Sequence, residues 1–568
     1  MSKRITIDPI TRIEGHLRID VEVGGDNKVS NAWASGTMWR GVEQILLGRD
    51  PRDAWAITQR FCGVCTTVHA IASVRAVENA LDLPVPKNAQ YIRNLMIAAH
   101  AIHDEIVHFY HLSALDWVDV TSALKADPAK TAALAESLSP WPLNGKAEMT
   151  AVQEKLKGLV ASGQLGIFAN GYWGHPAMKL PPEVNLLAVA HYLQALDVQR
   201  QANKIVAILG SKTPHIQNVA VGGVSNPVSL NSQSVLSVER LLAIKAHIDA
   251  VKDFINQVYL IDVAAVAAFY PEWTQLGKGV TNYLACPDFP LDERGTQFET
   301  SGGYVAGGQL DSFKPITRFG DTYFREGVAE SVKHSWYQGG KGALHPYKGE
   351  TNAEFTDFQE NGKYSFVKSP TFLGQPAQVG PLARVLMAVA TKDTEVTKHL
   401  DRLLGLIDAV GKVKVPLEGL HSTLGRHAAR AVMCARNVEI LEKQWKLLID
   451  NIAKGDVHTF EKPVFPTGEV SGFGFHEAPR GLLSHWVVIE NGVIKNYQAV
   501  VPTTWNAAPR NENDAIGPYE SSLLGTPLAD PERPLEVLRT IHSFDPCLAC
   551  AVHLTDVTKR PIVKVRAL

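Results

Sequence analysis

The amino-acid sequence predicts an α+β fold that is mostly α, with a large central helical bundle and small β-hairpin regions in the N- and C-terminal parts. Two observations predict this class. The middle of the chain has long segments with helical periodicity, and short alternating runs of apolar and polar residues lie near both ends. The chain has 568 residues, of which 45% are hydrophobic and 20% charged, so it can bury a large core.

The first expected element is a hairpin within residues 4–36. Apolar residues at every second position from Leu17 to Val23 alternate with charged ones, and the Gly-Gly-Asp-Asn sequence at 24–27 supplies a turn. A matching hairpin is expected near the other end, where two apolar runs within residues 486–497 flank an Asn-Gly turn signal. Strands are therefore expected to frame both ends of the central bundle.

Four long helices are expected between the hairpins, each with apolar residues at helical spacing. They are Asn88 to about Leu115, Pro182–Leu209, Val235 to about Ala264, and His421–Lys454. Pro182 begins the second helix, while Gly210 and Gly455 follow the second and fourth as stop signals. Residues 265–375 are rich in Gly, Pro and Asp without a clear period, which indicates irregular loops and short strands.

Composition excludes several classes of protein. Lys and Arg total 56 against 58 Asp and Glu, a formal net charge of −2, so no nucleic-acid partner is expected. No apolar run is long enough to span a membrane, and residues 1–16 lack the apolar stretch of a secretory signal. Six cysteines are too few for a disulfide scaffold, which indicates folding in a compartment where thiols stay reduced.

Four of the six cysteines form two C-x-x-C pairs, Cys62 with Cys65 and Cys547 with Cys550. This spacing lets both sulfurs of a pair reach one metal ion. Because 482 positions separate Cys65 from Cys547, a local zinc module is excluded. The spacing alone leaves open two unrelated pairs, or one structural zinc site formed across the chain.

Other chemistry-bearing residues accompany both pairs. His69 lies four positions after Cys65, His553 lies three after Cys550, and an Arg-Ile-Glu-Gly-His block places Glu14 near an expected strand. Soft thiolates select nickel, zinc, copper or iron, and neighbouring imidazoles and carboxylates tune the bound metal. The neighbours therefore favour a reactive metal site over a purely structural one.

A third group of residues, within His103-Asp104-Glu105-x-x-His108, superficially resembles a zinc protease motif. His103 and His108 are five apart, so they project about 140° from each other on a helix and cannot share a metal as residues four apart do. His100, Asp104, His108 and His111 do share a face, which predicts a hydrogen-bonded polar stripe inside the bundle. The remaining thiols, Cys286 and Cys434, are expected to be buried and structural.

In combination, signatures from both ends of the chain resemble those of the large subunits of nickel-iron hydrogenases, most closely the respiratory, membrane-associated hydrogenase-2 type. They are RIEGH with TMWRGVE at 12–43, RFCGVCTTVHA at 60–70, EAPRGLLSHW at 477–486 and SFDPCLACAVH at 543–553. The resemblance covers essentially the whole chain. It implies a single large-subunit unit over residues 1–553, followed by a C-terminal maturation tail at 554–568.

The resemblance implies a catalytic subunit of an uptake hydrogenase that splits dihydrogen reversibly into protons and electrons. By this resemblance Cys62 and Cys547 are terminal ligands of nickel. Cys65 and Cys550 bridge nickel to an iron that carries carbonyl and cyanide ligands. These diatomic ligands are made and inserted by other proteins, so maturation factors are implied as partners.

Further roles follow from the same resemblance. Cys547 receives a proton that Glu14 passes outward, a task that suits a carboxyl because burial raises its pKa toward neutrality. Arg480 lies over the open metal position, held by Asp104 and Asp545. Three residues contact the groups around the metals: Pro479 and Thr503 face the cyanides, and His69 hydrogen-bonds a bridging thiolate.

A magnesium site is also implied, with Glu43, the backbone carbonyl of Ala499 and His553 as protein ligands and waters completing the shell. The Ala499 assignment depends on counting back from the C-terminal motif. Because His553 closes the family motif, residues 554–568 are expected to be removed by a C-terminal endopeptidase after the nickel is inserted.

The expected partner is an iron-sulfur small subunit, because Cys286 and Cys434 are too few to carry electrons away from the metals within this chain. Through it the enzyme would reach membrane or electron-acceptor subunits. The precursor is expected in the cytoplasm and the mature complex at the periplasmic side of the cell membrane, exported with the small subunit's twin-arginine signal. The alternatives are a hydrogen sensor of the same family, a structural zinc-binding protein and a redox-complex subunit of the NADH dehydrogenase type. Metal analysis would separate the zinc-binding alternative from the hydrogenase: nickel and iron together would exclude the structural zinc site, and zinc alone would exclude the hydrogenase.

Overall fold

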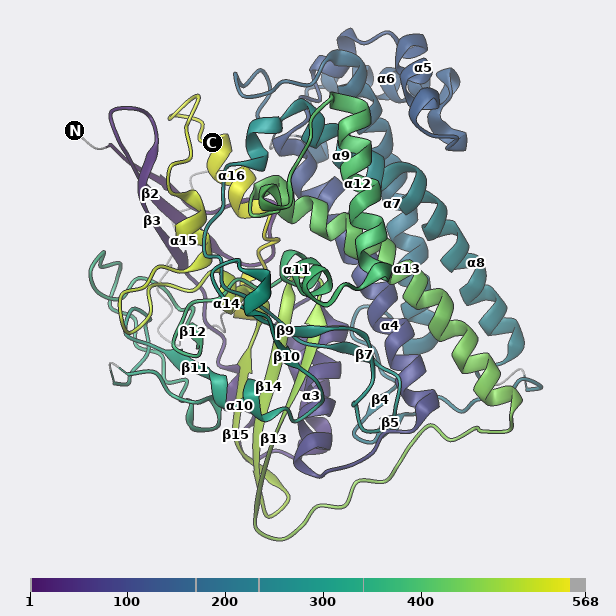
Figure 1. Cartoon of the computed structure of the whole chain (residues 1–568), viewed down its shortest axis with the longest axis vertical. Coiled ribbons are helices and arrows are strands. Elements are labelled where there is room, and N and C mark those ends of the chain that lie inside the picture. Colours follow the sequence, from purple (N-terminus) through teal and green to yellow (C-terminus); the bar gives the residue numbers. More distant parts are fainter. Residues whose placement is uncertain (1–2, 169–170, 233–234, 341, 552–568) are drawn as a thin grey trace.

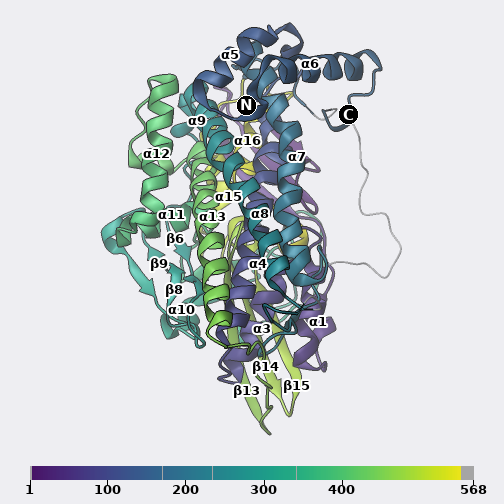
Figure 2. The same ribbon diagram turned by 90° about the vertical axis from the view of Figure 1, so that its right-hand side faces the viewer.

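The computed structural model describes residues 3–168, 171–232, 235–340 and 342–551. With 48% of residues helical and 17% in strands, distributed over small sheets, the predicted α+β class with helices in the majority is confirmed. The long helices lie together on one side of the molecule and the sheets on the other (Figures 1 and 2). No helix among the described residues is both long and apolar enough to cross a bilayer.

The helical bundle is built on four long helices that pack in the order α13, α4, α7, α8. They are α4 (Lys87–Ile106), α7 (Pro182–Gly210), α8 (Val238–Phe254) and α13 (Thr423–Ala453), which confirms the four predicted segments. Local signals explain their ends. The Ser422 side chain accepts a hydrogen bond from the N–H of Gly425 at the start of α13, and Ser211, with φ 65°, ends α7 in a left-handed conformation.

Two of the predicted helices change their geometry along their length. After Ile106 the chain of α4 continues as a π-helical segment, Val107–Ser113. The third predicted helix is divided into α8, a π-helical segment Ile255–Tyr259 and α9 (Leu260–Phe269). The 3.6-residue pattern could not distinguish either segment from an α-helix, because each π-helical segment is short and continues the helix that precedes it.

Several helices were not among the predicted segments. They are α1 (Val42–Leu46), α2 (Ala54–Thr58), α3 (Thr66–Ala80), α5 (Pro128–Leu138), α6 (Lys146–Ala161), α10 (Thr322–Gly327), α11 (Pro381–Thr391), α12 (Thr394–Gly411), α14 (Pro502–Asn506), α15 (Pro518–Leu523), α16 (Leu535–His542) and α17 (Leu548–Ala551). The helix α3 matters most for the site, because it begins next to Cys65. It is buried from Thr66 to Glu78 without interruption, so no polar face marks it as a helix in the sequence.

Both predicted hairpins are confirmed, and each gains a third strand. The N-terminal sheet pairs β1 (Lys3–Ile7), β2 (Leu17–Val23) and β3 (Val29–Gly36), and the C-terminal sheet pairs β13 (Glu469–Ala478), β14 (Gly481–Glu490) and β15 (Val493–Val500). All pairings in these two sheets are antiparallel. The predicted Asn-Gly turn joins β14 to β15 with positive φ at both residues.

The region predicted to be irregular contains loops and short paired strands. These are β6 (Tyr283–Ala285), β7 (Asp288–Pro290), β8 (Phe298–Thr300), β9 (Gly302–Val305), β10 (Lys314–Ile316), β11 (Val328–Ser331) and β12 (Ser369–Phe372), while β4 (Val219–Ala220) and β5 (Gly223–Val224) form a further pair earlier in the chain. Cys286 and Cys434 are free and buried, in agreement with the prediction.

The helix α3 lies directly against the C-terminal sheet. Two glycines of β13 permit this approach, because a Cβ at Gly472 would lie 2.3 Å from the nitrogen of Ala80, and one at Gly474 would lie 2.3 Å from the nitrogen of Ala76. The first cysteine pair, which precedes α3, is thereby brought to the end of the sheet where β13 turns into β14.

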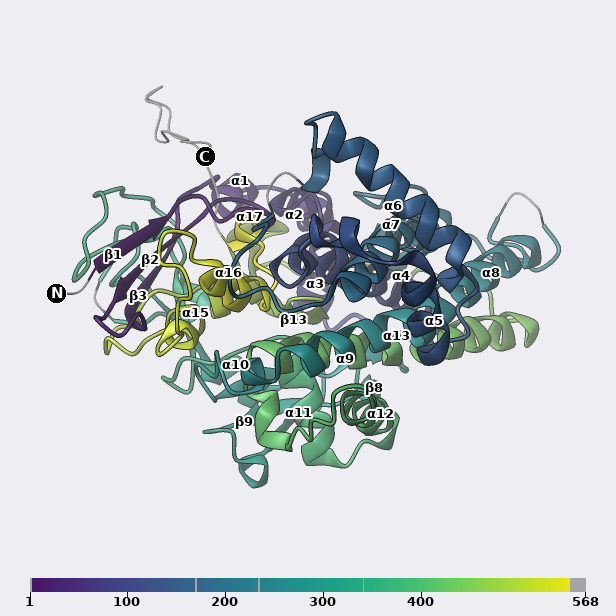
Figure 3. The ribbon, with the colours of Figure 1, turned by 90° about the horizontal axis from the view of Figure 1, so that it is seen from above.

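The N-terminal sheet contacts elements from the C-terminal part of the described chain. Strand β3 packs on α15, and the N-terminal sheet lies beside α15 and α16 (Figures 1 and 3). The segment before β2 also pairs with the second cysteine motif, since the N–H of Glu14 donates to the carbonyl of Pro546 at 3.3 Å and the N–H of Leu548 donates to the carbonyl of Glu14 at 2.7 Å. This contact places the RIEGH block beside Cys547.

Candidate metal centre

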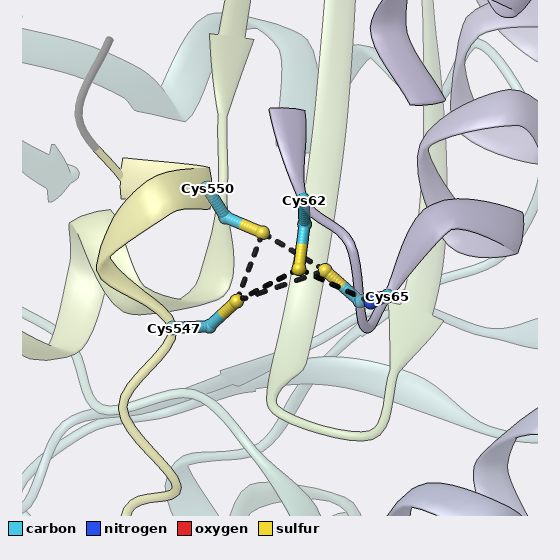
Figure 4. A group of neighbouring side chains, drawn as sticks. All are labelled: Cys62, Cys65, Cys547 and Cys550. Carbon is cyan, nitrogen blue, oxygen red and sulfur yellow. Dashed lines mark hydrogen bonds between the residues drawn. The ribbon is translucent and has the colours of Figure 1, made fainter. Parts of the chain in front are cut away.

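The four cysteines of the two pairs converge on one point in the interior (Figure 4). Their sulfur atoms lie within 4.8 Å of one another, with Cys65 and Cys550 2.8 Å apart and Cys62 and Cys547 3.3 Å apart. Each of the four residues is at most 3% exposed. The first pair comes from the turn that leads into α3, and the second from the loop and short helix α17 after α16.

Local contacts hold the two cysteine loops in this arrangement. The N–H groups of Val64 and Cys65 both lie 3.2 Å from the sulfur of Cys62, so that sulfur sits in a pocket of backbone donors. The guanidinium of Arg40 donates to the carbonyls of Arg60 and Phe61 on one loop and, at 2.9 Å, to that of Ala549 on the other. Arg40 therefore ties the two loops together.

The donor set fits soft metal ions. Burial raises the pKa of the Cys547 and Cys550 thiols well above their usual range, whereas hydrogen bonds from the neighbouring thiols lower that of Cys62 against the effect of burial. Four thiolates could exist together here only around cations that neutralise them. The arrangement therefore suits nickel, iron or zinc, for which thiolates are preferred ligands.

Glu14 lies at the edge of the four-cysteine group. One carboxyl oxygen is 3.4 Å from the sulfur of Cys547, which donates to it, and the same oxygen accepts from the N–H of Ala549 at 3.0 Å. Burial, followed by the charge of Cys62, raises the pKa of Glu14 to about 7. A carboxyl group with this pKa can both take up and release a proton near neutral pH.

Arg480 enters the same space from the turn between β13 and β14. Its guanidinium is 2.8 Å from a carboxyl oxygen of Asp104, on α4, and 3.1 Å from one of Asp545, in the loop before Cys547. All three residues are at most 4% exposed. The arrangement predicted for this arginine, with both carboxylates positioned to hold it, is therefore present in the structure.

The residues expected around the metals also lie near the cysteines. The hydroxyl of Thr503, on α14, accepts a hydrogen bond from the N–H of Cys547 at 3.1 Å, and Pro479 immediately precedes Arg480. One ring nitrogen of His69 is 3.2 Å from the sulfur of Cys550 and the other is 3.1 Å from His485. His69 thus bonds one of the four sulfurs, and its orientation is fixed from the opposite side.

Two of the residues expected to bind magnesium, Glu43 and Ala499, contact each other. Glu43, on α1, is 4% exposed and accepts a hydrogen bond from the N–H of Ala499 at 2.9 Å. Its other oxygen accepts from the hydroxyl of Thr351 and is 3.9 Å from the ammonium of Lys368. His553 and the tail at 554–568 lie outside the described residues.

The polar stripe on the helix bearing Asp104 is largely hydrogen-bonded, as predicted. His108 contacts the carbonyl of His542 at 2.6 Å and His111 contacts that of Tyr192 at 3.2 Å. Within the described part of the chain no hydrogen-bond partner reaches either ring nitrogen of His100. Among the described residues, the ligand atoms of His103 lie within 4.8 Å of those of His100 and Asp104, and His108 does not belong to this group, in agreement with the rejection of a protease-like zinc site.

Sequence reasoning missed other residues of the site, among them Arg430 and His485. His485 occurs within the EAPRGLLSHW signature, where its position on a buried strand could have marked it. Arg430 lies in the N-terminal part of α13, on a stretch that is buried from Thr423 to Val438. An arginine in such a stretch is a signal, because a buried charge needs a partner.

Comparison with known proteins gives the family. The model of the nickel-dependent hydrogenase family matches residues 40–553, and a HoxL-like model matches residues 4–34. The chain is 58% identical to the hydrogenase-2 large chain of Escherichia coli K12 over the full length of both proteins. It is 46% identical to the uptake hydrogenase large subunit of Bradyrhizobium diazoefficiens, covering 99% of this chain and 97% of that subunit.

Solved structures with a similar fold are also hydrogenases. The reduced Ni-Fe-Se hydrogenase of Desulfovibrio vulgaris Hildenborough superposes with a TM-score of 0.78 at 32% identity, over 97% of this chain and 100% of the other. The alternatives of a structural zinc protein and of an NADH dehydrogenase subunit lose their support. Because these matches include both cysteine pairs and the residues that surround them, the chain belongs to the nickel-dependent hydrogenase family, as the large subunit of a nickel-iron enzyme that cleaves dihydrogen.

Proposed function

We propose that the four sulfurs divide the ligand roles of a nickel-iron centre between them. Cys62 and Cys547 would be the terminal ligands of nickel, while Cys65 and Cys550 would be shared between nickel and an iron that also carries carbonyl and cyanide. The sulfurs of Cys65 and Cys550 form the shortest of the four described sulfur pairs, at 2.8 Å, which is the arrangement expected for two bridging ligands shared by the same two metals.

The centre, when bound, supplies the Lewis acidity that splits dihydrogen heterolytically. The observation that carries the proposal is the contact of 3.4 Å between the carboxyl of Glu14 and the sulfur of Cys547. Cys547 is the base that accepts the proton, and Glu14 takes that proton from the sulfur and passes it outward. The pKa of about 7 at Glu14 matches this function, since neither protonation state is strongly favoured at neutral pH.

Arg480 acts on the open side of the metals. Its planar, permanently charged guanidinium is held from two directions by Asp104 and Asp545, so it is fixed before dihydrogen enters. A fixed positive charge stabilises charge that develops during bond cleavage without any reorganisation at that moment.

Three further residues contact the groups around the metals. Pro479 and Thr503 would lie beside the cyanide ligands of iron, to which the hydroxyl of Thr503 could donate. His69 donates to the sulfur of Cys550, 3.2 Å away, and thereby reduces the negative charge on a bridging ligand.

We propose a magnesium site at Glu43, the carbonyl of Ala499 and His553. The carboxylate of Glu43 is buried, and the backbone of Ala499 is within hydrogen-bond distance of it. A hard oxygen-rich site that retains several waters is the coordination that magnesium prefers. With His553 as a ligand, the bound magnesium would hold the C-terminal residue of the mature chain.

The mature protein is proposed to be one unit over residues 1–553 that works with an iron-sulfur small subunit. Maturation factors load the metals, and a C-terminal endopeptidase removes residues 554–568. The large chain enters the periplasm with its partner, and electrons leave through the small subunit to membrane or electron-acceptor subunits in anaerobic respiration. The two cysteines outside the site, Cys286 and Cys434, are both buried and cannot form an electron relay.

Metal analysis of the purified complex tests the proposal. Anomalous scattering from both nickel and iron at the four-cysteine site is the expected result, and total iron should exceed nickel because the clusters of the small subunit also contain iron. Zinc alone at this site would overturn it. Anomalous scattering cannot detect magnesium, so the Glu43 site is tested by elemental analysis of the same sample.

A further inference from the structure

A second buried arginine, Arg430 on α13, contacts both loops that carry the proposed reaction-site pair Arg480 and Asp545. Its Nη1 donates to the carbonyl of Pro479 at 3.0 Å, and its Nη2 donates to the carbonyl of Phe544 at 2.9 Å. Pro479 immediately precedes Arg480, and Phe544 immediately precedes Asp545. One guanidinium therefore fixes the backbone next to each member of the pair.

The charge of Arg430 is balanced from the helical bundle. Its Nη1 lies 3.1 Å from a carboxyl oxygen of Glu105 on α4 and 3.8 Å from one of Asp545. Asp545 thus lies between two arginines, since Arg480 is 3.1 Å away. The consecutive acids Asp104 and Glu105 each hold one of these arginines, so a single turn of α4 anchors both.

All the groups in this network are buried, and Arg430 itself is 2% exposed. A buried guanidinium requires several acceptors at fixed angles, and here the acceptors come from α4 and from the two loops. A lysine has a single ammonium centre and cannot reach acceptors in all these directions. We propose that Arg430 is a positioning residue that holds Arg480 and Asp545 in place for the cleavage of dihydrogen.

This inference rests on the proposed role of Arg480, but its structural content can be tested separately. In Arg430→Lys, kcat for hydrogen oxidation is expected to fall by about ten- to a hundred-fold, because small displacements of a reacting group have effects of this size. The KM for dihydrogen and the nickel and iron content are expected to stay at parent values. A crystal structure of the loaded heterodimer is expected to show the Arg480 guanidinium displaced from Asp545.

Arg93→Lys is the matched control. Arg93 is fully buried on α4 and, like Arg430, bonds a glutamate, Glu78, and two backbone carbonyls, those of Ala220 and Gly223. None of these partners belongs to the two loops. Equal losses of kcat and of melting temperature in Arg430→Lys and Arg93→Lys would show general destabilisation and overturn the proposal.

Glu105→Gln provides a second variant if Arg430→Lys does not accumulate. It leaves every donor of Arg430 in place but removes the carboxylate charge that anchors it, so a smaller fall in kcat with the same displacement of Arg480 is expected. An unmoved Arg480 with parent kcat in either variant would also overturn the inference. A displaced Arg480 with parent kcat would support the positioning contact and refute the proposed role of Arg480 instead.

Discussion

The proposed proton route depends on one carboxyl group near the N-terminus, Glu14, which contacts the second cysteine motif. Glu14 accepts from the N–H of Ala549 and contacts the sulfur of Cys547 through the same oxygen. A glutamine at position 14 could still accept the hydrogen bond from the N–H of Ala549 but could not transfer a proton. A single substitution therefore separates the backbone contact from the proton-transfer role.

Glu14→Gln is expected to lower hydrogen oxidation by about a hundred-fold or more, the usual contribution of a general acid-base group. The nickel and iron content should stay unchanged, because no metal ligand is altered. Dye reduction under hydrogen and elemental analysis of the same sample measure both quantities. The control is Glu22→Gln on β2, and full turnover in Glu14→Gln would mean that protons leave by another route.

Arg480→Lys keeps the positive charge but loses the planar fork that reaches Asp104 and Asp545 together. Turnover is expected to fall about ten-fold or more, which corresponds to the loss of ~1.4 kcal/mol of transition-state stabilisation. Steady-state kinetics at saturating hydrogen check this. Parent kinetics in the variant would remove Arg480 from the mechanism.

The site residues found from sequence were those that lie in distinctive local motifs. The C-x-x-C spacing marked all four cysteines, and family signatures marked Glu14 and Arg480. Arg430 was missed because its partners, Pro479 and Phe544, are far away in the sequence and contribute only backbone carbonyls, which any residue type possesses.

At the scale of elements, Gly15 decides how closely the N-terminal segment approaches the second cysteine loop. Its φ is +80°, and a Cβ there would lie 2.4 Å from the backbone nitrogen of Ala549. The loop cannot retreat without moving Cys547 and Cys550. A glycine is therefore needed here for two reasons: it adopts the positive φ, and it has no Cβ that would collide with the backbone of Ala549.

Gly15→Ala is expected to destabilise the chain by about 1–3 kcal/mol and to reduce metal retention, because strain and overcrowding push the cysteine loop outward. Gly25→Ala is the control, since a Cβ at Gly25 meets no atom within 4 Å. Melting temperature and nickel content are the measurements. A Gly15→Ala protein that matches Gly25→Ala in both would show that the loop tolerates the displacement.

A buried carboxylate joins the N-terminal segment to α16. Asp116 lies 2.5 Å from Arg12 and 2.6 Å from His542. Against the effect of burial, the charges of Arg12 and His542 lower the pKa of Asp116 to about 2. Its ionised form therefore contributes stability above the ordinary carboxyl pKa of 3.8, and this contribution is lost as the pH falls toward 2.

Asp116→Asn should be less stable than the parent near pH 6 by on the order of 2 kcal/mol, and the difference should shrink as the pH is lowered below about 4. Melting temperatures measured across this range check the sign. Asp197→Asn, at an exposed aspartate with 77% of its side chain accessible, is the control. A difference that stays constant with pH would exclude the ionisation of Asp116 as its cause.

Regular alternation and helical periodicity predicted some elements, whereas α3 and β13 carry no such pattern. The alternation from Leu17 to Val23 gave β2, and the periodicity of residues 182–209 gave α7. The helix α3 has no polar stripe to mark its period, and β13 contains glycines that serve packing rather than strand propensity.

At the scale of the whole molecule, the proposed maturation tail at residues 554–568 is expected to be removed after the nickel is inserted. Intact-mass measurement of the large subunit from active enzyme is expected to show a chain that ends at His553, without Leu554–Leu568. The inactive precursor should retain the full 568 residues. Active, metal-loaded enzyme whose large subunit still ends at Leu568 would contradict the maturation role of the tail.

The convergence of two cysteine pairs from nearly opposite ends of the chain also has a consequence for unfolding. Metals shared by Cys65 and Cys547 close a loop of 482 residues, in the way that a covalent cross-link would. Such a closure lowers the conformational entropy of the unfolded chain by an amount worth about 6 kcal/mol at 25 °C, if it persists on unfolding. A loaded subunit thus has fewer unfolded conformations available to it than an empty one, and proteases that act on opened chains would distinguish the two.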